Sequence, residues 1–357
     1  MTRFEKKFPH TASLLHQAVD KVFPAYAAGV WNKGEAYFGA EGCAQDSLFD
    51  LASLTKVLCT TTLCAAAEEK AVLEISEPLK AFFPKFPDPR VKLSHLLDHS
   101  SGFPSWLPLH ERFHAPGDRG EFDPRATPAV ARVAYEEEIL KSWSSADFEK
   151  KVTYSDLGMM LLGWALEIRA GQPVDALFQE WVAGPAGLSS LQFLPTSPDV
   201  VPTELCPWRG HILRGEVHDD NCYVLGGVCA HAGLFGNVQD VLKAALLWLA
   251  AFRGEKTLIV PATARRYFTF THMPGSVRSL GWDGIARDGT SAAGRHFSPA
   301  TRGHLGFTGT SLWVDPEKNL IVVLLTNRVH PTRSNEKIKS FRSLFHDSLL
   351  EELGFAK

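Results

Sequence analysis

Strand patterns lie at both ends of this 357-residue chain, and helical patterns fill its middle. Two runs of β-type residues, 25–31 and 35–40, flank a turn at Asn32–Gly34. Two apolar runs, 305–314 and 320–326, predict a second hairpin near the C-terminus. We therefore expect one antiparallel sheet that is built from both termini of the chain.

Helical periodicity surrounds and separates these strands. Residues 71–210 combine mixed helical patterns with many prolines. We predict an α/β (α+β) fold in which helices flank an antiparallel sheet. Residues 1–70 and 211–357 would form the α/β lobe, and residues 71–210 a mostly helical lobe inserted into it. A cleft between two lobes is a common place for an active site. The longest predicted helices cover residues 11–23, 157–169, 238–252 and 334–353.

A serine and a lysine stand one helical turn apart at Ser53 and Lys56. The helical pattern that contains them runs to about Glu69, and Asp50 is predicted to be its N-cap. The helix dipole disfavours a cation in the first turn, and partial burial does the same. This placement predicts a neutral Lys56 amine that acts as a general base beside the Ser53 hydroxyl. The same spacing recurs at residues 334–337 among basic neighbours, where it indicates a solvated helix start.

Two further motifs follow in a fixed order along the chain. Residues 153–156 precede a strong helix, and His304–Thr310 opens the first strand of the final hairpin. A leucine–histidine–serine–glycine loop lies at Leu96–Pro104, and glycine-rich segments lie at 225–227 and 231–235. Together with the serine–lysine pair, this order resembles the serine β-lactamase and penicillin-binding protein superfamily, closest to its class C-like branch. The resemblance covers nearly the whole chain and implies the β-lactamase/transpeptidase-like fold.

The resemblance implies a role for each matching residue. Ser53 matches the acylated nucleophile, and Lys56 matches its base. Tyr154 matches the tyrosine that relays the proton to the leaving group and helps to activate the deacylating water; a nearby cation can lower the pKa of such a tyrosine. The oxyanion hole would consist of the backbone N–H groups of Ser53 and Phe307.

Several positions depart from the pattern of that superfamily. Asp156 stands where many members have asparagine, and it has no amide to donate. His304 stands where many have lysine; it can donate a hydrogen bond to a substrate carboxylate or carry a charge at mildly acid pH. Leu305 replaces a hydroxyl residue, Gly306 lets a substrate lie against the strand edge, and Thr308 completes the predicted substrate-binding stretch. These departures disfavour tight recognition of β-lactams or D-Ala-D-Ala.

We therefore predict a serine hydrolase that works through an acyl-enzyme on Ser53. Its substrates would be small esters or D-amino-acid amides and peptides; the alternative is a β-lactamase or D,D-carboxypeptidase acting on penicillin or peptidoglycan peptides. The segment His110–His114 matches a zinc metallopeptidase signature, but prolines bracket it and no third ligand is evident. A binding protein that had lost catalysis would not need Lys56 and Tyr154 beside the serine. We expect neither a cofactor nor a metal.

The amino-acid composition limits the kinds of partner and the cellular compartment that we expect for this protein. A net charge of −3 favours neither nucleic acid nor an anionic membrane as a partner, which leaves a small-molecule ester, amide or β-lactam. The six cysteines form no zinc spacing and are interpreted as reduced thiols. The first residues lead into no apolar signal region, and the uncharged run Ala244–Phe252 is too short to span a bilayer. We expect a cytoplasmic protein, or a periplasmic one if the chain is a trimmed form.

Overall fold

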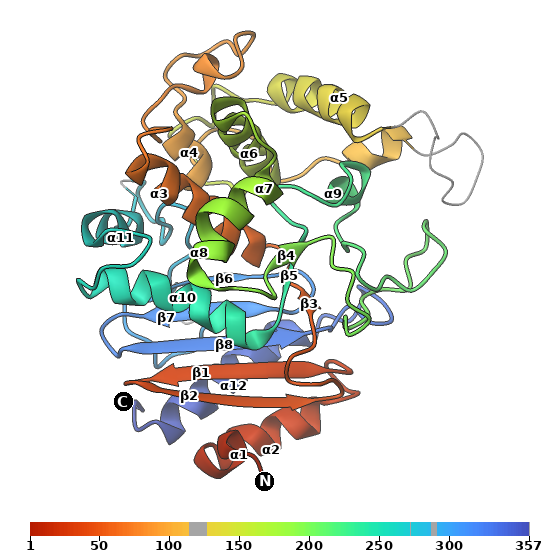
Figure 1. The fold of residues 1–357 in the computed structure, drawn as a ribbon, viewed down its shortest axis with the longest axis vertical. Coiled ribbons are helices and arrows are strands. Elements are labelled where there is room, and N and C mark those ends of the chain that lie inside the picture. The colour runs from red at the N-terminus through yellow and green to blue at the C-terminus, as the bar shows by residue number, and fades with distance from the viewer. Residues whose placement is uncertain (114–126, 272, 287–290, 357) are drawn as a thin grey trace.

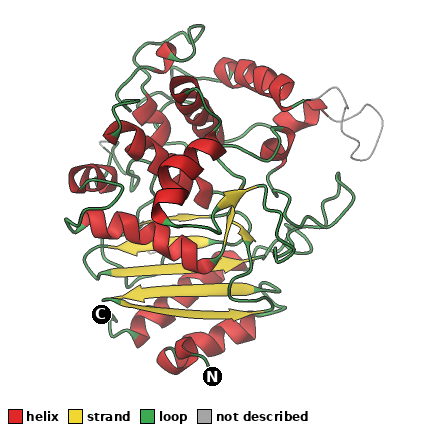
Figure 2. Cartoon of the chain, in the orientation of Figure 1, coloured by secondary structure: helices red, strands yellow, loops and turns green. Residues whose placement is uncertain are grey.

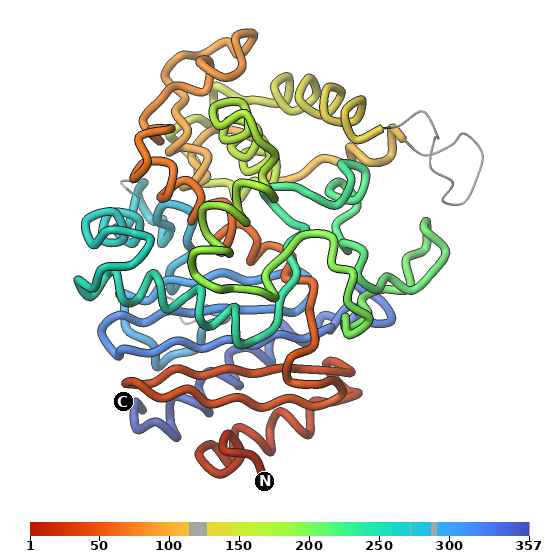
Figure 3. Tube along the Cα trace, viewed as in Figure 1, coloured from red at the N-terminus to blue at the C-terminus, as the bar shows by residue number. Residues whose placement is uncertain are grey.

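A computed structural model describes residues 1–113, 127–271, 273–286 and 291–356 (Figure 1). Its centre is a five-stranded antiparallel sheet with the strand order β2-β1-β8-β7-β6. The N-terminal hairpin joins the C-terminal strands through the pairing of β1 with β8, so the two ends of the chain lie side by side (Figure 3). This confirms the prediction of a sheet built from both termini. The strands are β1 (Tyr26–Asn32), β2 (Glu35–Glu41), β6 (Arg302–Leu305), β7 (Ser311–Asp315) and β8 (Leu320–Thr326).

Helices cover both faces of this sheet, which explains why β8 is an unbroken apolar run. On one face, Leu320, Val322 and Leu324 pack in a core with the helices from the two termini. On the other face, Ile321 and Val323 pack in a core with α10. The helices on the first face are α1 (Arg3–Lys7), α2 (Pro9–Ala18) and α12 (Ile338–Glu352), and α10 spans Val238–Phe252 (Figure 1).

Helices predominate in the part of the chain between β2 and β6, and they lie to one side of the five-stranded sheet (Figure 2). They surround a small three-stranded sheet of order β3-β5-β4. The core on the α10 face continues into this region, so the lobe boundaries at residues 70 and 210 stay a prediction. The helices are η1 (Lys56–Thr61), α3 (Thr62–Glu69), η2 (Leu79–Ala81), α4 (Leu93–Leu97), η3 (Leu109–Phe113), α5 (Pro128–Lys141), α6 (Asp156–Ala170), α7 (Val174–Phe178), η4 (Gln179–Ala183), α8 (Gly184–Ala186), α9 (Asp220–Val224) and α11 (Pro261–Phe268), and the small strands are β3 (Phe49–Asp50), β4 (Gln192–Phe193) and β5 (Leu234–Gly236).

Four predicted elements differ from the structure. The closing helix predicted at residues 334–353 begins only at Ile338. The helix predicted at residues 11–23 ends at Ala18, and a second short helix precedes it. The run at 305–314 is not one strand, because β6 ends at Leu305 and a tight turn precedes β7. That turn closes through a 2.7 Å hydrogen bond from Gly306 N to Thr310 O. The helix predicted to start near Asp50 begins at Leu54, becomes a π-helix over Lys56–Thr61 and continues into α3. No helix among the described residues is long and apolar enough to cross a membrane.

Candidate active site

Ser53 lies in a strained turn between β3 and the π-helix η1. The preceding residue, Ala52, has φ +48°, a left-handed conformation that a residue with a side chain adopts only at an energetic cost. The Asp50 carboxylate accepts a 2.8 Å hydrogen bond from Ala52 N, and the Thr55 hydroxyl donates a 2.6 Å bond to the carbonyl of Ala52. The other carboxylate oxygen of Asp50 accepts from His218 N at 2.7 Å. Asp50 therefore holds the nucleophile turn and is not the helix N-cap that the sequence predicts.

Lys56 is buried beside Ser53 and makes two hydrogen bonds and one ion pair through its ammonium group. Its Nζ lies 2.9 Å from Ser53 Oγ, 2.8 Å from the carbonyl oxygen of His231 and 2.7 Å from Asp156 Oδ1. Burial disfavours the ammonium form, but Asp156 and Tyr154 more than offset this effect, and the pKa of Lys56 is raised. The prediction of a neutral amine in the first turn is therefore wrong for the resting site. The reason is a carboxylate from a distant segment, which outweighs both burial and the helix end.

Tyr154 packs against Lys56 at the start of α6. The ring centroid lies 5.1 Å from Lys56 Nζ and 5.1 Å from Cζ of Arg278, and the phenol hydroxyl interacts with Lys56 and Ser53. Burial raises the pKa of Tyr154 more than the Lys56 cation lowers it. The expected lowering of this pKa is therefore wrong, and the resting side chain is a neutral phenol. The Ser155 hydroxyl caps α6 by accepting a 3.0 Å bond from Gly158 N, which fixes the residues on either side of it.

His304 lies in β6 next to Tyr154, and the two ring centroids are 5.7 Å apart. Its Nδ1 donates to the carbonyl of Leu305 at 2.8 Å. Burial, followed by the charges of Lys56 and Arg278, lowers the pKa of His304 to about 3. The imidazole is thus neutral even at mildly acid pH, which corrects the prediction of a charge there. Its Nε2 has no partner among the described residues and carries a lone pair in this tautomer, so it can accept a hydrogen bond but not donate one.

These side chains meet in a cleft of about 660 Å³. Lys56 lies below the cleft surface, beneath Ser53. Thr308 is buried and donates a 2.8 Å bond to the carbonyl of Asp50, so its hydroxyl is not offered to a substrate as predicted. The residues of the predicted site that line the cleft are Ser53, Tyr154, Asp156, His304, Leu305, Gly306 and Phe307.

Gly306 has a packing role in the turn between β6 and β7. A Cβ at this position would clash with Thr310 Oγ1 and come within 2.7 Å of the Leu51 carbonyl oxygen. Glycine is therefore required for the β6–β7 turn to approach the nucleophile turn; that it also lets a substrate lie against the strand edge stays a prediction.

The backbone N–H groups of Ser53 and Phe307 are the donors that the sequence predicts for an oxyanion hole. Neither Ser53 N nor Phe307 N donates a hydrogen bond to any of the residues that the structure describes. The Phe307 ring stacks on His218 at 5.5 Å and lies 4.5 Å from the Arg328 guanidinium, which fixes the residue from both sides. This pair of N–H groups is what an oxyanion would require.

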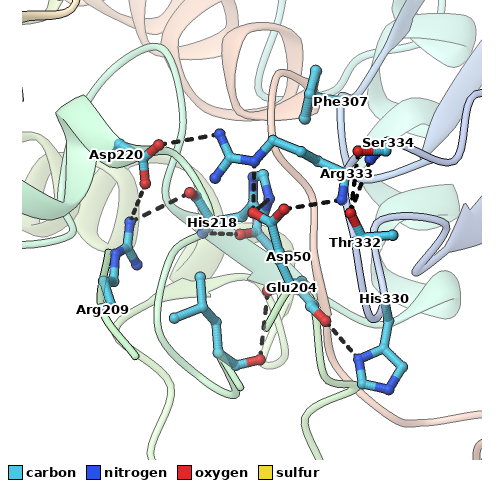
Figure 4. Close-up of polar contacts among 12 residues, drawn as sticks. Asp50, Glu204, Arg209, His218, Asp220, Phe307, His330, Thr332, Arg333 and Ser334 are labelled. Atoms are coloured by element: carbon cyan, nitrogen blue, oxygen red, sulfur yellow. Dashed lines mark hydrogen bonds and ion pairs between the residues drawn. The ribbon is translucent and has the colours of Figure 1, made fainter. Parts of the chain in front are cut away.

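A polar network beside Phe307 was not predicted (Figure 4). Glu204 accepts from Arg333 Nε at 2.6 Å and lies 3.1 Å from His218 Nε2. Burial opposes ionisation of Glu204, but His218 and Arg333 lower its pKa to about 2. Arg333 also pairs with Asp220 at 3.2 Å. These residues come from separate segments, so no local spacing could have revealed the network.

The zinc signature falls at the edge of the described residues. His110 lies in the short helix η3, where its backbone N–H donates to Asn221 Oδ1 at 2.9 Å. His114 lies outside the residues that the structure describes. In the described part of the chain, no group of three or more histidine, cysteine or acidic side chains could hold a metal ion.

Comparisons with known proteins agree with this geometry. The chain is 28% identical over 316 residues to an N-acetylmuramyl-L-alanine amidase of Bacillus subtilis (strain 168), covering 80% of this chain and 68% of that protein. It is 28% identical over 321 residues to a putative D-alanyl-D-alanine carboxypeptidase of Escherichia coli (strain K12), covering 80% and 70%.

Solved structures show the same fold at lower sequence identity. An octameric penicillin-binding protein homologue from Pyrococcus abyssi has a TM-score of 0.74 and 19% identity, covering 97% of this chain and 77% of that one. A class C beta lactamase from Rhodobacter sphaeroides has a TM-score of 0.69 and 18% identity, covering 96% and 98%. The predicted β-lactamase/transpeptidase-like fold is confirmed. The Beta-lactamase family model matches residues 10–345, and the chain therefore belongs to this family of serine hydrolases.

Proposed function

We propose that this enzyme cleaves an ester or amide bond through an acyl-enzyme on Ser53. The observation that carries the proposal is the 2.9 Å contact between Ser53 Oγ and Lys56 Nζ at the floor of a cleft, beside two backbone N–H groups without acceptors among the described residues. A nucleophile, a proton acceptor and an oxyanion site within one cleft are the parts that acyl transfer needs.

The first step follows from the charge of Lys56. The ammonium must release a proton to solvent before its nitrogen can accept one from Ser53. Because Asp156 raises the pKa of Lys56, the neutral amine is a minor form at neutral pH. The same carboxylate makes that amine a stronger base once it forms, and it holds Nζ at 2.7 Å.

Acylation then moves one proton and exchanges one bond. Ser53 Oγ attacks the substrate carbonyl carbon while its proton passes to Lys56 Nζ, and the carbonyl oxygen becomes an oxyanion at the N–H groups of Ser53 and Phe307. The bond from the carbonyl carbon to the leaving oxygen or nitrogen breaks next. Tyr154, a neutral phenol in contact with Lys56, gives its proton to the leaving atom and regains one from the lysine.

Deacylation repeats this chemistry with water. A water molecule attacks the acyl carbon and passes a proton to the neutral Lys56, which leads to a second oxyanion at the same site. Ser53 leaves with a proton from Lys56, and the product is a carboxylic acid. The cycle consumes one water and needs no group beyond these side chains.

Small esters or D-amino-acid amides are the substrates that the cleft wall supports best. His304 is neutral, Leu305 has no hydroxyl, and neither can hold a substrate carboxylate as a lysine–threonine pair would. Trp106 and Phe307 expose apolar rings that line the same cleft, with 44% and 52% of the residue accessible. An uncharged acyl group with apolar character fits such walls.

A carboxylate-bearing substrate is the second candidate, because Arg278 also lines the cleft. Its guanidinium lies 3.6 Å from Asp283 and 5.1 Å from the Tyr154 ring centroid. A D-Ala-D-Ala peptide or a β-lactam carries an anion that could pair with it, and the curated relatives are named as a carboxypeptidase and an amidase. Comparing kcat/KM for a p-nitrophenyl ester, a D-Ala-D-Ala peptide and nitrocefin separates the candidates.

The nucleophile is tested by labelling the protein with a fluorophosphonate and locating the adduct by mass spectrometry. We expect the adduct on Ser53, and we expect Ser53→Ala to lose the label and at least about 10³-fold in kcat. Ser334→Ala is the matched control, since Ser334 precedes Lys337 with the same spacing but is exposed. A label that survives in Ser53→Ala, or that disappears in Ser334→Ala, would contradict the proposal.

A further inference from the structure

Two buried arginines lie under the turn that carries Phe307. Arg342 Nη2 donates to the carbonyls of Gly306 and Thr310, both at 2.8 Å. Arg328 Nε donates to the carbonyl of Phe307, also at 2.8 Å. Neither guanidinium has a carboxylate within ion-pair distance in the part of the chain that the structure describes, and both line the cleft.

Such cations are costly to bury. Arg342 is 6% exposed and Arg328 is 5% exposed, and burial lowers the pKa of both, that of Arg342 to about 9. A buried charge without a counter-ion is destabilising unless its hydrogen bonds serve a purpose. Here both hydrogen bonds that the structure describes for Arg342 reach one turn, residues 306–310. Arg328 reaches the same turn through Nε, and through Nη1 it donates to the carbonyls of Arg333 and Asn335.

The same turn is tied to the nucleophile from its other side. The Thr308 hydroxyl donates to the Asp50 carbonyl at 2.8 Å, and the Thr310 hydroxyl donates to the Leu51 carbonyl at 3.1 Å. The turn is therefore bonded both to the two arginines and to the nucleophile turn. This arrangement fixes Phe307 N relative to Ser53.

The contact with Gly306 has a second effect, because the Gly306 carbonyl and the Phe307 N–H belong to one planar peptide unit. A cation that donates to the carbonyl oxygen draws electron density through this unit and strengthens its N–H as a donor. Arg342 would thus both orient the oxyanion N–H and polarise it.

We propose that Arg342, supported by Arg328, is a positioning residue of the oxyanion hole. The inference rests on the proposed function, since it requires a tetrahedral intermediate on Ser53. It adds that the donor strength of Phe307 N–H depends on a guanidinium on α12. The substrate does not touch this group in the proposed mechanism; the group acts through the peptide between Gly306 and Phe307.

Arg342→Met tests the proposal against Arg302→Met as a matched control. Arg302 is also buried, and among the described residues it donates only to the backbone carbonyls of Pro299 and Thr301. Its guanidinium lies 3.8 Å from the Phe270 ring centroid, and burial lowers its pKa to about 10. It is not part of the cleft wall. Both changes remove a buried cation, so both should shift the melting temperature in a similar way.

Only Arg342→Met should impair chemistry. We expect its kcat on a p-nitrophenyl ester to fall by about 30-fold or more with KM within about 3-fold, since loss of one oxyanion donor costs about 10²–10³. Arg302→Met should keep kcat within about 3-fold of wild type. Arg342→Lys, which keeps a cation, should recover part of the loss. The amide ¹H–¹⁵N signal of Phe307 should shift in Arg342→Met and not in Arg302→Met.

Equal kcat losses in the two methionine variants, or a rise in KM with unchanged kcat in Arg342→Met, would overturn the inference. If Arg342→Met fails to fold, Arg328→Gln takes its place, with the same split between kcat and KM expected. The proposed function fails separately, when wild-type protein labels at a residue other than Ser53. The amide signal of Phe307 would still report on positioning in that case.

Discussion

Replacing Asp156 with asparagine should reveal what keeps the proton on Lys56. The Asp156 carboxylate lies 2.7 Å from Lys56 Nζ, and the two side chains are 17% and 1% exposed. Asparagine keeps the size and removes the charge, so burial would then favour the neutral amine. We expect the pKa of Lys56 to fall in this variant.

The size of the fall in the Lys56 pKa can be worked out from how deeply Lys56 and Asp156 are buried. Breaking a mostly buried ion pair by removing one partner costs about 3–5 kcal/mol. Because the carboxylate is partly exposed, the low end applies, and about 3 kcal/mol corresponds to roughly 10²-fold in the proton affinity of Lys56. At neutral pH the fraction of neutral Lys56 should rise by about the same factor. The plateau rate should fall, since a weaker base removes the serine proton less readily.

The assay is the pH dependence of kcat/KM for a p-nitrophenyl ester between about pH 5 and pH 9.5, corrected for uncatalysed hydrolysis. Wild type has a Lys56 pKa raised above its usual range, so its kcat/KM should climb through the neutral range into the alkaline range. Asp156→Asn should reach its plateau about two pH units below wild type, which is the shift that a roughly 10²-fold loss in proton affinity gives. Asp156→Glu, which retains the charge, should keep the alkaline profile. The reasoning would be refuted if kcat/KM of Asp156→Asn rose with pH over the same range as that of wild type.

Three further changes test the residues around this pair. Burial opposes the charged form of His231, but Cys229 and Asp219 raise its pKa to about 10. The pKa of histidine in the unfolded chain is about 6.5. Protonated His231 therefore stabilises the folded state fully below about pH 6.5, and this contribution is lost as pH rises towards about 10. The free energy of unfolding from urea titrations should fall over this window by up to about 1.4 kcal/mol per pH unit, and His231→Gln should flatten the fall. Gly306→Ala should cost about 1–3 kcal/mol of stability and lower kcat, because its Cβ would push the turn away from the nucleophile; unchanged urea midpoints and kcat would contradict this. Leu305→Thr adds a hydroxyl to the cleft and should raise kcat/KM for a D-Ala-D-Ala peptide about 2–10-fold, with Leu305→Val as the control that should not.

Local sequence patterns predicted those helices and strands that depend mainly on residues close to them in the chain. The β1–β2 hairpin and the helix α10 fall where periodicity places them. The buried strand β8 could be recognised because helices on both faces require an unbroken apolar run. The turn at residues 306–310 could not, because its glycines and threonines have meaning only against the nucleophile turn, which lies far away along the chain.

The residue types of the site could be predicted, but their charges could not. The resemblance indicated Ser53, Lys56, Tyr154 and His304, and the cleft brings them together. The resting charge of Lys56 depends on Asp156, and burial decides that of Tyr154 and His304. Burial and charge pairing arise only after folding, so a helix-end argument from sequence gave the wrong sign for Lys56.

The neutrality of His304 follows from the charges that already surround it. Lys56 and Arg278 both lower its pKa, after burial, so a third cation at this position would be strongly disfavoured. The Arg278 guanidinium lies 5.1 Å from the Tyr154 ring centroid and 3.6 Å from Asp283. A cation therefore lines the cleft from a loop, whereas the strand β6 contributes the neutral His304. A substrate anion would then be held from that loop rather than from the strand edge, which is why the choice between esters and carboxylate-bearing peptides turns on the reach of Arg278 rather than on His304.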